Sequence, residues 1–432
     1  MELSRYLKIF PPAVENGPHL LYSTLRGALL HIPAELLAAL QEGSLEPEEQ
    51  ELLARLGILV PDALAERERL RGFFAEAEQR SDRFTYVVTL NLDCNLACPY
   101  CYEDHFRGRR YMSDDTASLL IDAATGGPLA RGRNLRTEFY GGEPLLSLPL
   151  LCRIAAALQR AAAEQGLSYS FMLVTNGTLL TRQVVEELLP LGLAGARVTL
   201  DGPPDIHNRQ RPFVSGQGSF ERILDNLADV CDLTAIQLNG NYTRENYRRF
   251  PELLDLLPAR GLTPDKLRAV TFNPVTPTAG EAGLSDFSLG CACMAEPWLI
   301  EAGLFLRGEI LKRGYHTPRI RFNACVVEFE SDLVVNYDGS LYRCPAFMGW
   351  NDLCIGSLAE GVKDYRDSHR LGLWQNDECL DCPYLPLCFG GCRFLRRLRT
   401  GAIDGVDCRR DYLDAALERL LRQDLEQRDR QD

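Results

Sequence analysis

The chain has 432 residues, a formal net charge of −13 and 15 cysteines. Its length allows two or three domains, and its acidic balance argues against a nucleic-acid partner, which would require a basic face. The sequence shows neither the uninterrupted apolar run that a membrane span needs nor a secretory signal at its start, so we expect a cytoplasmic protein without a membrane partner. Because that compartment keeps thiols reduced, the cysteines are expected to be metal-binding or catalytic rather than disulfide-bonded.

Residues 1–80 are expected to form a small separate domain. The stretch HLLYSTLRGALLHIP predicts two short strands around a turn at Arg26 and Gly27. AELLAALQEG and PEEQELLARLG predict two helices, the second begun by Pro47 and ended by Gly57. ILVPD is expected to be a returning strand. This order of elements predicts a winged-helix-like unit.

Residues 81–315 alternate between strand and helix patterns. Strands are predicted at residues 85–92, 135–140, 168–176, 196–202, 234–241 and 266–275, each followed by a helical segment. Such alternation predicts an α/β fold with a parallel sheet and helices outside it. Six units are too few to close an eight-stranded barrel, so we expect a partial (β/α)6 barrel. Its chemistry should lie in the loops after the carboxyl ends of the strands.

Residues 316–432 are expected to form a third domain of a different kind. They are rich in cysteine, glycine and aromatic residues, and a helical pattern returns only at residues 411–427. A loop-rich region of this size needs something other than a large apolar core to hold it together. Bound metal would serve that purpose.

The segment NLDCNLACPYC follows directly on the first strand of the alternating region and holds Cys94, Cys98 and Cys101. Three thiolates within eight residues can surround one soft-metal centre, and iron–sulfur clusters are held by such cysteine runs. In a [4Fe-4S] cluster, three protein thiolates leave one iron open to a small molecule. A zinc site completed by His105 is the alternative at this point.

The next three strands also end in polar loops. FYGGEP places Gly141 and Gly142 where the backbone could approach a ligand closely, and Glu143 where it could bind an ammonium group. VTNGTLL and VTLDGPPDIHNRQRP follow the third and fourth strands. Each loop alone is compatible with ordinary turn chemistry, but four such loops behind four consecutive strands favour a shared site.

This motif set resembles the radical S-adenosylmethionine (SAM) superfamily over about residues 85–315. The resemblance implies a radical SAM partial barrel, with Cys94, Cys98 and Cys101 holding a [4Fe-4S] cluster whose open iron takes the amino and carboxylate groups of SAM. It implies further SAM contacts from Tyr100 at the adenine, Gly141, Gly142 and Glu143 at the methionine amine, Thr199 at the ribose and Arg211 at the carboxylate. An electron from a donor such as flavodoxin or ferredoxin would split SAM, and the 5′-deoxyadenosyl radical would abstract hydrogen from the substrate.

The second cysteine set is similar to the SPASM domain of radical SAM peptide-modifying enzymes, although a zinc ribbon is the alternative for its CxxC pair. Its spacing is C-x13-G-x4-C followed by CxxCx5CxxxC and one further cysteine. The resemblance implies two auxiliary [4Fe-4S] clusters, three clusters in all. Cys379, Cys382, Cys388 and Cys408 would hold one, and Cys325, Cys344 and Cys392 the other. The second of these would have an open iron for a substrate thiolate unless Cys354 is its fourth ligand.

The N-terminal module resembles the leader-peptide recognition elements of such enzymes, which bind an extended peptide at a sheet edge. The whole chain most resembles geopeptide-type maturases, which implies a ribosomally made precursor peptide as substrate and a thioether crosslink as product. The alternative is oxidation of Ser or Cys to formylglycine, as in sulfatase maturation, or another radical peptide modification. Enzymes of sulfatase maturation carry Asp after the cysteine that matches Cys344, where this chain has Pro345. An iron–sulfur electron carrier is the alternative from another class.

The remaining cysteines and one histidine have weaker assignments. Cys152 and Cys231 fall in helical patterns and are expected to be core thiols. Cys291 and Cys293 are expected to line a loop. His207, in the loop after the fourth strand, is expected to be a structural hydrogen bonder rather than a general base.

Overall fold

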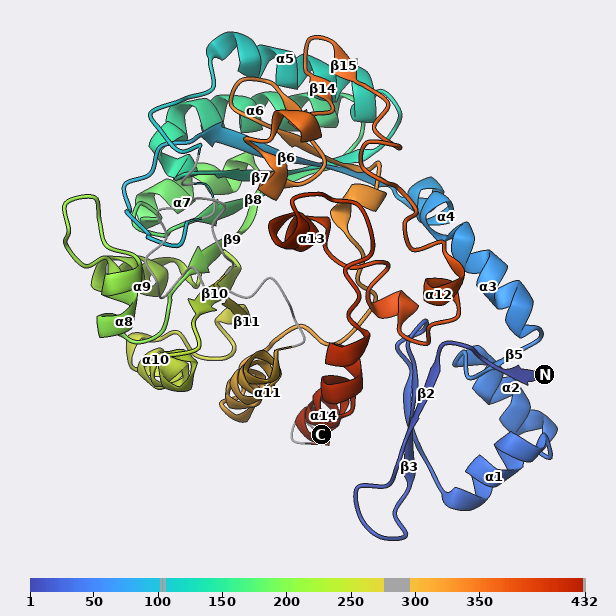
Figure 1. The fold of residues 1–432 in the computed structure, drawn as a ribbon. Coiled ribbons are helices and arrows are strands. Elements are labelled where there is room, and N and C mark those ends of the chain that lie inside the picture. The colour runs from blue at the N-terminus through green and yellow to red at the C-terminus, as the bar shows by residue number, and fades with distance from the viewer. Residues whose placement is uncertain (102, 104–105, 276–295, 430–432) are drawn as a thin grey trace. The chain divides into compact units, whose positions relative to one another are not determined.

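The computed structural model describes residues 1–101, 103, 106–275 and 296–429 (Figure 1). The chain divides into two compact units. One consists of Met1–Arg80, Arg319–Phe329 and Arg370–Asp432, and the other of Ser81–Pro318 and Glu330–His369. The residues that were expected to form a third domain, 316–432, are thus distributed over both units. His105, Cys291 and Cys293 lie outside the described residues.

The larger unit is built on an eight-stranded sheet of order β11-β10-β9-β8-β7-β6-β12-β13. The six predicted strands are present and pair in parallel in chain order, which confirms the partial α/β barrel. They are β6 (Arg83–Asn91), β7 (Asn134–Gly141), β8 (Tyr169–Thr175), β9 (Leu193–Thr199), β10 (Ile236–Tyr242) and β11 (Leu267–Pro274). Two strands that the sequence did not predict extend the sheet: β12 (Asp332–Val335) runs parallel to β6, and β13 (Leu341–Tyr342) antiparallel to β12.

Helices follow the strands as the patterns predicted. They are α5 (Asp114–Ala124), α6 (Leu148–Glu164), α7 (Arg182–Leu188), α9 (Phe220–Val230), α10 (Phe250–Leu256) and α11 (Pro297–Lys312). Ser113 and Thr181 cap α5 and α7, each accepting a hydrogen bond from a backbone N–H of the first turn. One difference lies after β9, where a loop was expected: Pro204–Gln210 forms the short helix α8. Pro203 and Pro204 start it, because proline suits the first turn of a helix.

The segment Pro144–Glu164, which includes α6, is long and apolar enough to cross a membrane by length and composition. Arg153 and Arg160 interrupt it, so the expectation that the chain lacks an uninterrupted apolar run still holds. In the structure, the apolar residues of α6 recur at helical spacing and are buried: Leu151, Ile154, Ala155, Leu158, Ala161 and Ala162. Contacts with α5, β7 and β8 place α6 against the parallel sheet, as in a core helix.

The smaller unit begins with an antiparallel sheet of β2 (Leu7–Phe10), β3 (His19–Ser23) and β4 (Leu29–Ile32). The predicted strands β3 and β4 and the predicted helices α1 (Ala34–Glu42) and α2 (Pro47–Arg55) are confirmed. The returning strand β5 (Leu59–Val60) exists, but it pairs with β1 (Glu2–Leu3) rather than with this sheet. The helices α3 (Ala63–Arg71) and α4 (Phe73–Arg80) then lead to the larger unit.

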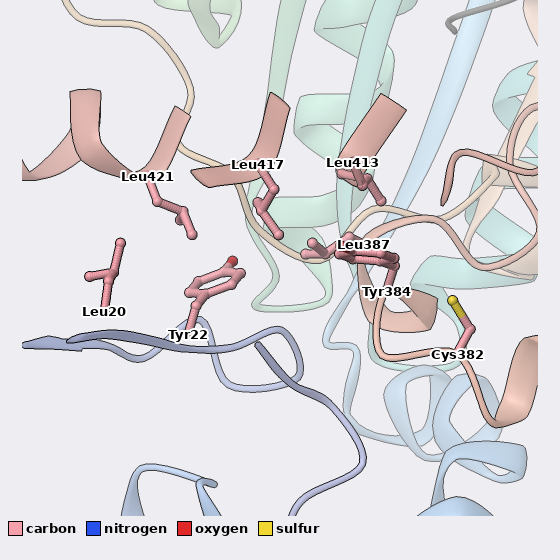
Figure 2. Close-up of a cluster of buried hydrophobic side chains, with 8 residues drawn as sticks. All are labelled: Leu20, Tyr22, Cys382, Tyr384, Leu387, Leu413, Leu417 and Leu421. Atoms are coloured by element: carbon pink, nitrogen blue, oxygen red, sulfur yellow. The ribbon is translucent and has the colours of Figure 1, made fainter. Parts of the chain in front are cut away.

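The small sheet is covered on both faces. Because side chains alternate along a strand, Leu21 of β3 faces the core formed with α1 and α2, whereas Leu20 and Tyr22 face the other way. Figure 2 shows these two side chains against Leu413, Leu417 and Leu421 of the C-terminal helix α14 (Arg410–Asp429), beside Tyr384 and Leu387. Residues 1–80, which were expected to form a separate domain, therefore share a hydrophobic core with the C-terminal part of the chain.

An aromatic cluster adds a second core to this unit. Phe73 of α4 lies 4.8 Å from Phe322 between ring centroids, and Phe74 lies 5.0 Å from Phe389 and 5.5 Å from Trp374. The remaining elements are short and loop-connected: β14 (Gly356–Ser357), β15 (Gly361–Val362), α12 (Asp377–Leu380) and α13 (Arg393–Thr400). Of these, β14 and β15 belong to the larger unit and α12 and α13 to the smaller.

Candidate functional site

The first cysteine loop follows β6 at the carboxyl edge of the parallel sheet. Cys94, Cys98 and Cys101 are partly buried free thiols. The backbone N–H of Leu96 and the side-chain amide of Asn176 donate to Cys94 Sγ, at 3.5 and 3.6 Å. Such donors stabilise a thiolate. Three soft sulfur donors at the end of a strand fit an iron–sulfur cluster.

The protonation state of these thiols is sensitive to metal. Burial, followed by the charge of Glu103, raises the pKa of the Cys101 thiol to about 12. Burial also raises the pKa of Cys94 and Cys98. The thiols are therefore neutral near pH 7 without metal, and cluster binding would have to displace their protons.

The paired glycines after β7 have a structural reason that differs from the predicted one. A Cβ on Gly141 would lie 2.2 Å from the carbonyl oxygen of Asn91, and one on Gly142 would lie 2.1 Å from that of Asp93. The backbone N–H groups of Gly142 and Glu143 donate to these same two oxygens, at 3.1 and 2.8 Å. The glycines thus bring the loop after β7 against the cysteine loop itself. Their approach to a ligand remains a prediction.

Glu143 ties the loop after β7 to the loop after β8. Its buried carboxylate accepts hydrogen bonds from Thr175 Oγ1 at 2.8 Å, Asn176 N at 2.8 Å and Leu145 N at 3.0 Å. Burial raises the pKa of this carboxyl, and the three hydrogen bonds oppose the rise. A carboxylate has about four acceptor positions, so these bonds use most of its capacity. Its contact with a methionine amine remains a prediction.

Asn176, which the sequence suggested only as a turn residue, connects the loop after β8 to the cysteines. Besides its contact with Cys94, its side-chain amide donates to Asn95 Oδ1 at 2.8 Å, and its oxygen accepts from the backbone and hydroxyl of Thr178. Its position directly after the third parallel strand is the signal that could have identified it.

A polar network joins the loop after β6, the region after β9 and the last residues of β10. The Tyr100 hydroxyl donates to Asp201 Oδ2 and accepts from Arg211 NH1 at 2.8 Å. The backbone N–H of Asn241 donates to Asp201 Oδ1 at 2.7 Å. The structure thus brings together the predicted residues Tyr100 and Arg211. Asp201 and Asn241 were missed, although both stand at strand ends in VTLDG and QLNGN.

The buried Arg211 Nε, an atom of this network, lacks a hydrogen-bond acceptor among the described residues. A buried donor without an acceptor is costly, so an anionic group beside Arg211 would stabilise the site. The carboxylate of SAM, which the resemblance places there, is such a group.

His207 and Thr199 complete the region after β9. His207 is buried, with Nδ1 accepting from Asp201 N at 3.1 Å and Nε2 3.0 Å from Ser219 Oγ. Burial, reinforced by Arg211, holds its pKa well below the usual range, so it stays neutral. The prediction of a structural hydrogen bonder is confirmed. Thr199 is half-buried at the end of β9 opposite Asn239 of β10, and its ribose contact remains a prediction.

The second cysteine set lies largely in the smaller unit. Cys379, Cys382, Cys388 and Cys408, the four residues assigned to one auxiliary cluster, line a single cavity. Burial, followed by the charges of Cys382 and Cys379, raises the pKa of Cys388 to about 12. Burial and the charge of Cys325 raise the pKa of Cys392. Cys344 and Cys354 belong to the larger unit, where Cys354 Sγ donates to the carbonyl of Gly356 at 3.2 Å.

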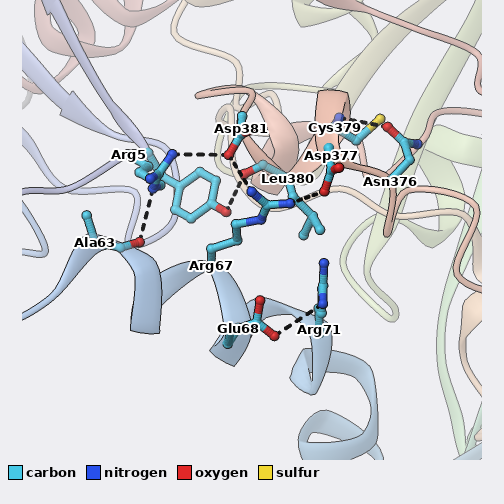
Figure 3. Close-up of polar contacts among 11 residues, drawn as sticks. Arg5, Ala63, Arg67, Glu68, Arg71, Asn376, Asp377, Cys379, Leu380 and Asp381 are labelled. Atoms are coloured by element: carbon cyan, nitrogen blue, oxygen red, sulfur yellow. Dashed lines mark hydrogen bonds and ion pairs between the residues drawn. The ribbon is translucent and has the colours of Figure 1, made fainter.

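Side chains from the N-terminal module hold the helix that carries Cys379. Figure 3 shows Arg67 reaching Asp377 and Asp381 at the two ends of α12, and Arg5 NH1 lies 3.1 Å from Asp381 Oδ1. The Tyr6 hydroxyl donates to the carbonyl of Leu380 at 2.9 Å. These contacts could not be predicted from local sequence patterns, because they join residues more than 300 positions apart.

The other cysteines differ from expectation. Cys152 and Cys231 are partly exposed rather than core thiols. Cys152 Sγ donates to a carboxylate oxygen of Glu187, and Cys231 Sγ, just after α9, donates to the carbonyl of Ala228, each at 3.5 Å. In the described part of the chain, no three His, Cys, Asp or Glu side chains are grouped to hold a single metal ion.

Comparison with known proteins places this site in a family. Residues 89–257 match the model of the radical SAM superfamily. The chain is 24% identical to the PqqA peptide cyclase of Granulibacter bethesdensis over 344 residues, covering 74% of this chain and 85% of that one. It is 25% identical to a cysteine-type anaerobic sulfatase-maturating enzyme of Clostridium perfringens over 341 residues, covering 70% and 86%.

Two solved structures share the fold. The structure of anSMEcpe with bound AdoMet and Kp18Cys peptide aligns with a TM-score of 0.63 at 18% identity, covering 79% of this chain and 98% of that one. Streptococcus suis SuiB bound to the precursor peptide SuiA aligns with a TM-score of 0.53 at 13% identity, covering 94% and 98%. The cysteine loop and the loops after β7, β8 and β9 lie inside the matched residues, so the chain contains a radical SAM domain.

Proposed function

We propose that this enzyme is a peptide maturase that joins a cysteine sulfur to a carbon atom of a ribosomally made precursor peptide. The observation that carries the proposal is the presence of two cysteine sites in one chain. One lies at the strand ends of the radical SAM domain, and the other lines a cavity in the unit that contains the small N-terminal sheet. The likeness to PqqA peptide cyclase and to SuiB bound to its precursor peptide supports a peptide substrate.

In this proposal Cys94, Cys98 and Cys101 hold a [4Fe-4S] cluster. When bound, the cluster and SAM supply a 5′-deoxyadenosyl radical at the cost of one electron from a donor such as flavodoxin or ferredoxin. Arg211, whose buried Nε has no partner among the described residues, would hold the SAM carboxylate, and Tyr100, which Asp201 fixes in place, would hold the adenine. The backbone at residues 141–143 and Thr199 complete the contacts.

The second site would serve the coupling step. Cys379, Cys382, Cys388 and Cys408 would hold one auxiliary cluster, and Cys325, Cys344 and Cys392 another, with an open iron or with Cys354 as fourth ligand. The peptide loses one C–H and one S–H bond and gains a C–S bond. One hydrogen would leave in 5′-deoxyadenosine and the other as a proton, and a cluster held by the second cysteine set would supply an acceptor for the electron released on C–S bond formation. That electron balances the one that SAM cleavage consumes.

The N-terminal module would bind the leader segment of the precursor. Its sheet ends at β4 on one side, and an extended peptide could pair with this strand. Both faces of this sheet are covered by hydrophobic clusters, so a partner peptide would bind at the edge of the sheet. We expect the enzyme to act in the cytoplasm, where cysteine thiolates stay reduced.

Mass spectrometry of a co-expressed cysteine-containing peptide, encoded beside this gene, tests the proposal. We expect the peptide to lose the mass of two hydrogen atoms for each bond, with its thiol no longer open to alkylation. Cys98→Ala should abolish the change, because it removes a cluster ligand. An unmodified peptide in the presence of active SAM cleavage would contradict peptide maturation by this enzyme.

Formylglycine formation is the second candidate, because of the likeness to the sulfatase-maturating enzyme of Clostridium perfringens. Against it, Pro345 begins a short helical turn after Cys344 and supplies no carboxylate base. A hydrazide probe separates the two reactions, since it labels the aldehyde of formylglycine and leaves a thioether unchanged. Labelling of the product would replace the crosslinking proposal by this one.

A further inference from the structure

The larger unit contains a cavity of about 560 Å³ that has no part in the chemistry above. Its walls come from β6, the end of α5, β12, β13 and the β14–β15 hairpin, which lies near α5 in Figure 1. Its floor includes Phe84 and Tyr86, near the amino end of β6. The cysteine loop follows the opposite end of that strand, about 15 Å further along. The volume is typical of small-molecule sites.

The floor of this cavity is apolar and partly aromatic. Phe84 and Tyr86 are buried, with ring centroids 4.9 Å apart, because alternate residues of β6 face the same side. Leu333 of β12 lies beside Tyr86 in the sheet register, and Leu341 of β13 is also buried here. Such a surface accepts an aromatic or branched apolar group.

The walls carry an excess of positive charge. Arg343 is 3% exposed, and its guanidinium lies 5.0 Å from the centroid of the Tyr365 ring. Arg131, Lys363 and Arg366 stand around the opening, whereas Glu330 and Asp364 are the acidic lining residues. Both acids already lie within ion-pair distance of Arg366, at 3.7 and 3.9 Å. The basic groups therefore outnumber the acidic ones by two, in a chain of net charge −13.

The charge of Arg131 reaches the floor. Burial raises the pKa of the Tyr86 hydroxyl to about 12, and Arg131 opposes the rise. A ligand that rests on Phe84 and Tyr86 would thus lie between Arg343, which is buried in the wall, and Arg131, which stands at the opening. The planar guanidinium group matches a carboxylate with two parallel hydrogen bonds.

We propose that this cavity binds a carboxylate with an aromatic body, with the ring on Phe84 and Tyr86 and the carboxylate between Arg343 and Arg131. Two sources present this chemistry: a free arylalkanoic acid, and the C-terminal residue of a peptide that ends in Phe or Tyr. The site is distinct from the radical SAM chemistry, so the proposal stands or fails separately from the proposed function.

Calorimetric or ligand-observed NMR titration of the full-length, anaerobically purified protein tests the proposal. The probes are 3-phenylpropionate and an acetylated dipeptide ending in Phe, each compared with its neutral amide. We expect millimolar or tighter binding of at least one acid and a loss of about tenfold or more in its amide. Binding by the free acid alone identifies a small-molecule site, and tighter binding by the dipeptide identifies a peptide end. No binding by either acid, or equal binding by acid and amide, overturns the proposal.

Variants place the binding in this cavity. Arg343→Met keeps an unbranched apolar side chain and removes the charge, and Arg131→Glu inverts the charge of a second lining residue, at the opening. Each should weaken binding of the acid by about tenfold. Arg182→Gln, which removes an arginine from α7, is the matched control and should leave binding unchanged. Unchanged binding in Arg131→Glu, with a melting curve like that of the parent, contradicts the proposal even if Arg343→Met fails to fold.

Discussion

The two cysteine sites are held in different ways. The loop with Cys94, Cys98 and Cys101 is held by its neighbours in the parallel sheet, chiefly by backbone contacts that only glycine permits at Gly141 and Gly142. The cavity of the second set is held by residues from the other end of the chain, through ion pairs on α12 and a shared hydrophobic core. The first site therefore depends on local sheet geometry, and the second on the N-terminal module.

The largest effect is expected from Gly142→Ala. The added Cβ would meet the carbonyl oxygen and carbon of Asp93 at 2.1 and 2.6 Å, and this backbone cannot yield without moving the cysteine loop. Displacing a reacting group by about 1 Å can cost about a hundredfold in rate, so we expect at least that loss of SAM cleavage. Gly303→Ala in α11 meets nothing within 4 Å and is the control. SAM cleavage within a few-fold of the parent would show that the glycine contact is dispensable.

The N-terminal core is tested by Tyr22→Ala. Tyr22 is 1% exposed and packs in the cluster that includes Cys382, so truncation should destabilise the smaller unit by about 3 kcal/mol. We expect a lower melting temperature and less iron per chain, with peptide-independent SAM cleavage largely kept. Val14→Ala, at a 68% exposed position, is the control. A fall in SAM cleavage proportional to the loss of iron would show that the first cysteine site also depends on the N-terminal module.

Asp201→Asn tests the positioning network within the first site. The substitution keeps the shape of the side chain and removes the charge that faces Tyr100 and Arg211. We expect the KM for SAM to rise about tenfold, with kcat little changed and the cluster spectrum unaltered. Asp205→Asn, whose carboxylate pairs with the exposed Arg249, is the matched control. A fall in kcat at unchanged KM would assign Asp201 a role other than holding SAM contacts.

The smallest effect is expected from Arg67→Ala. It removes both ion pairs to α12, but Asp377 is 85% exposed and Asp381 46% exposed. Exposed ion pairs contribute about 0–1 kcal/mol each, so stability should fall by about 1 kcal/mol and the difference should shrink at high salt. Arg71→Ala, which breaks only the pair with Glu68, is the control (Figure 3). A loss as large as that of Tyr22→Ala would mean that the polar contacts, rather than the core, hold α12.

The sequence by itself determined the radical SAM sheet and the place of its cysteines. Each of the six strands is followed in the chain by its own helix, so the pattern that specifies them is local. The polar loops fall at one edge because the strands are parallel. Tyr100 and Arg211 were identified from the motif in the same way, whereas Asp201 and Asn241 were missed because turn chemistry explains such residues equally well.

Only the tertiary structure decided the remaining features, because they depend on contacts between distant residues. β12 pairs with β6, which lies almost 250 residues earlier in the chain. The short apolar run of β12 does not predict this pairing. Leu20 and Tyr22 find their partners in α14, so that two ends of the chain make one core. The glycines after β7 were expected to let the backbone approach a ligand, and the structure adds a second reason for them: an added Cβ would meet a carbonyl oxygen of the cysteine loop.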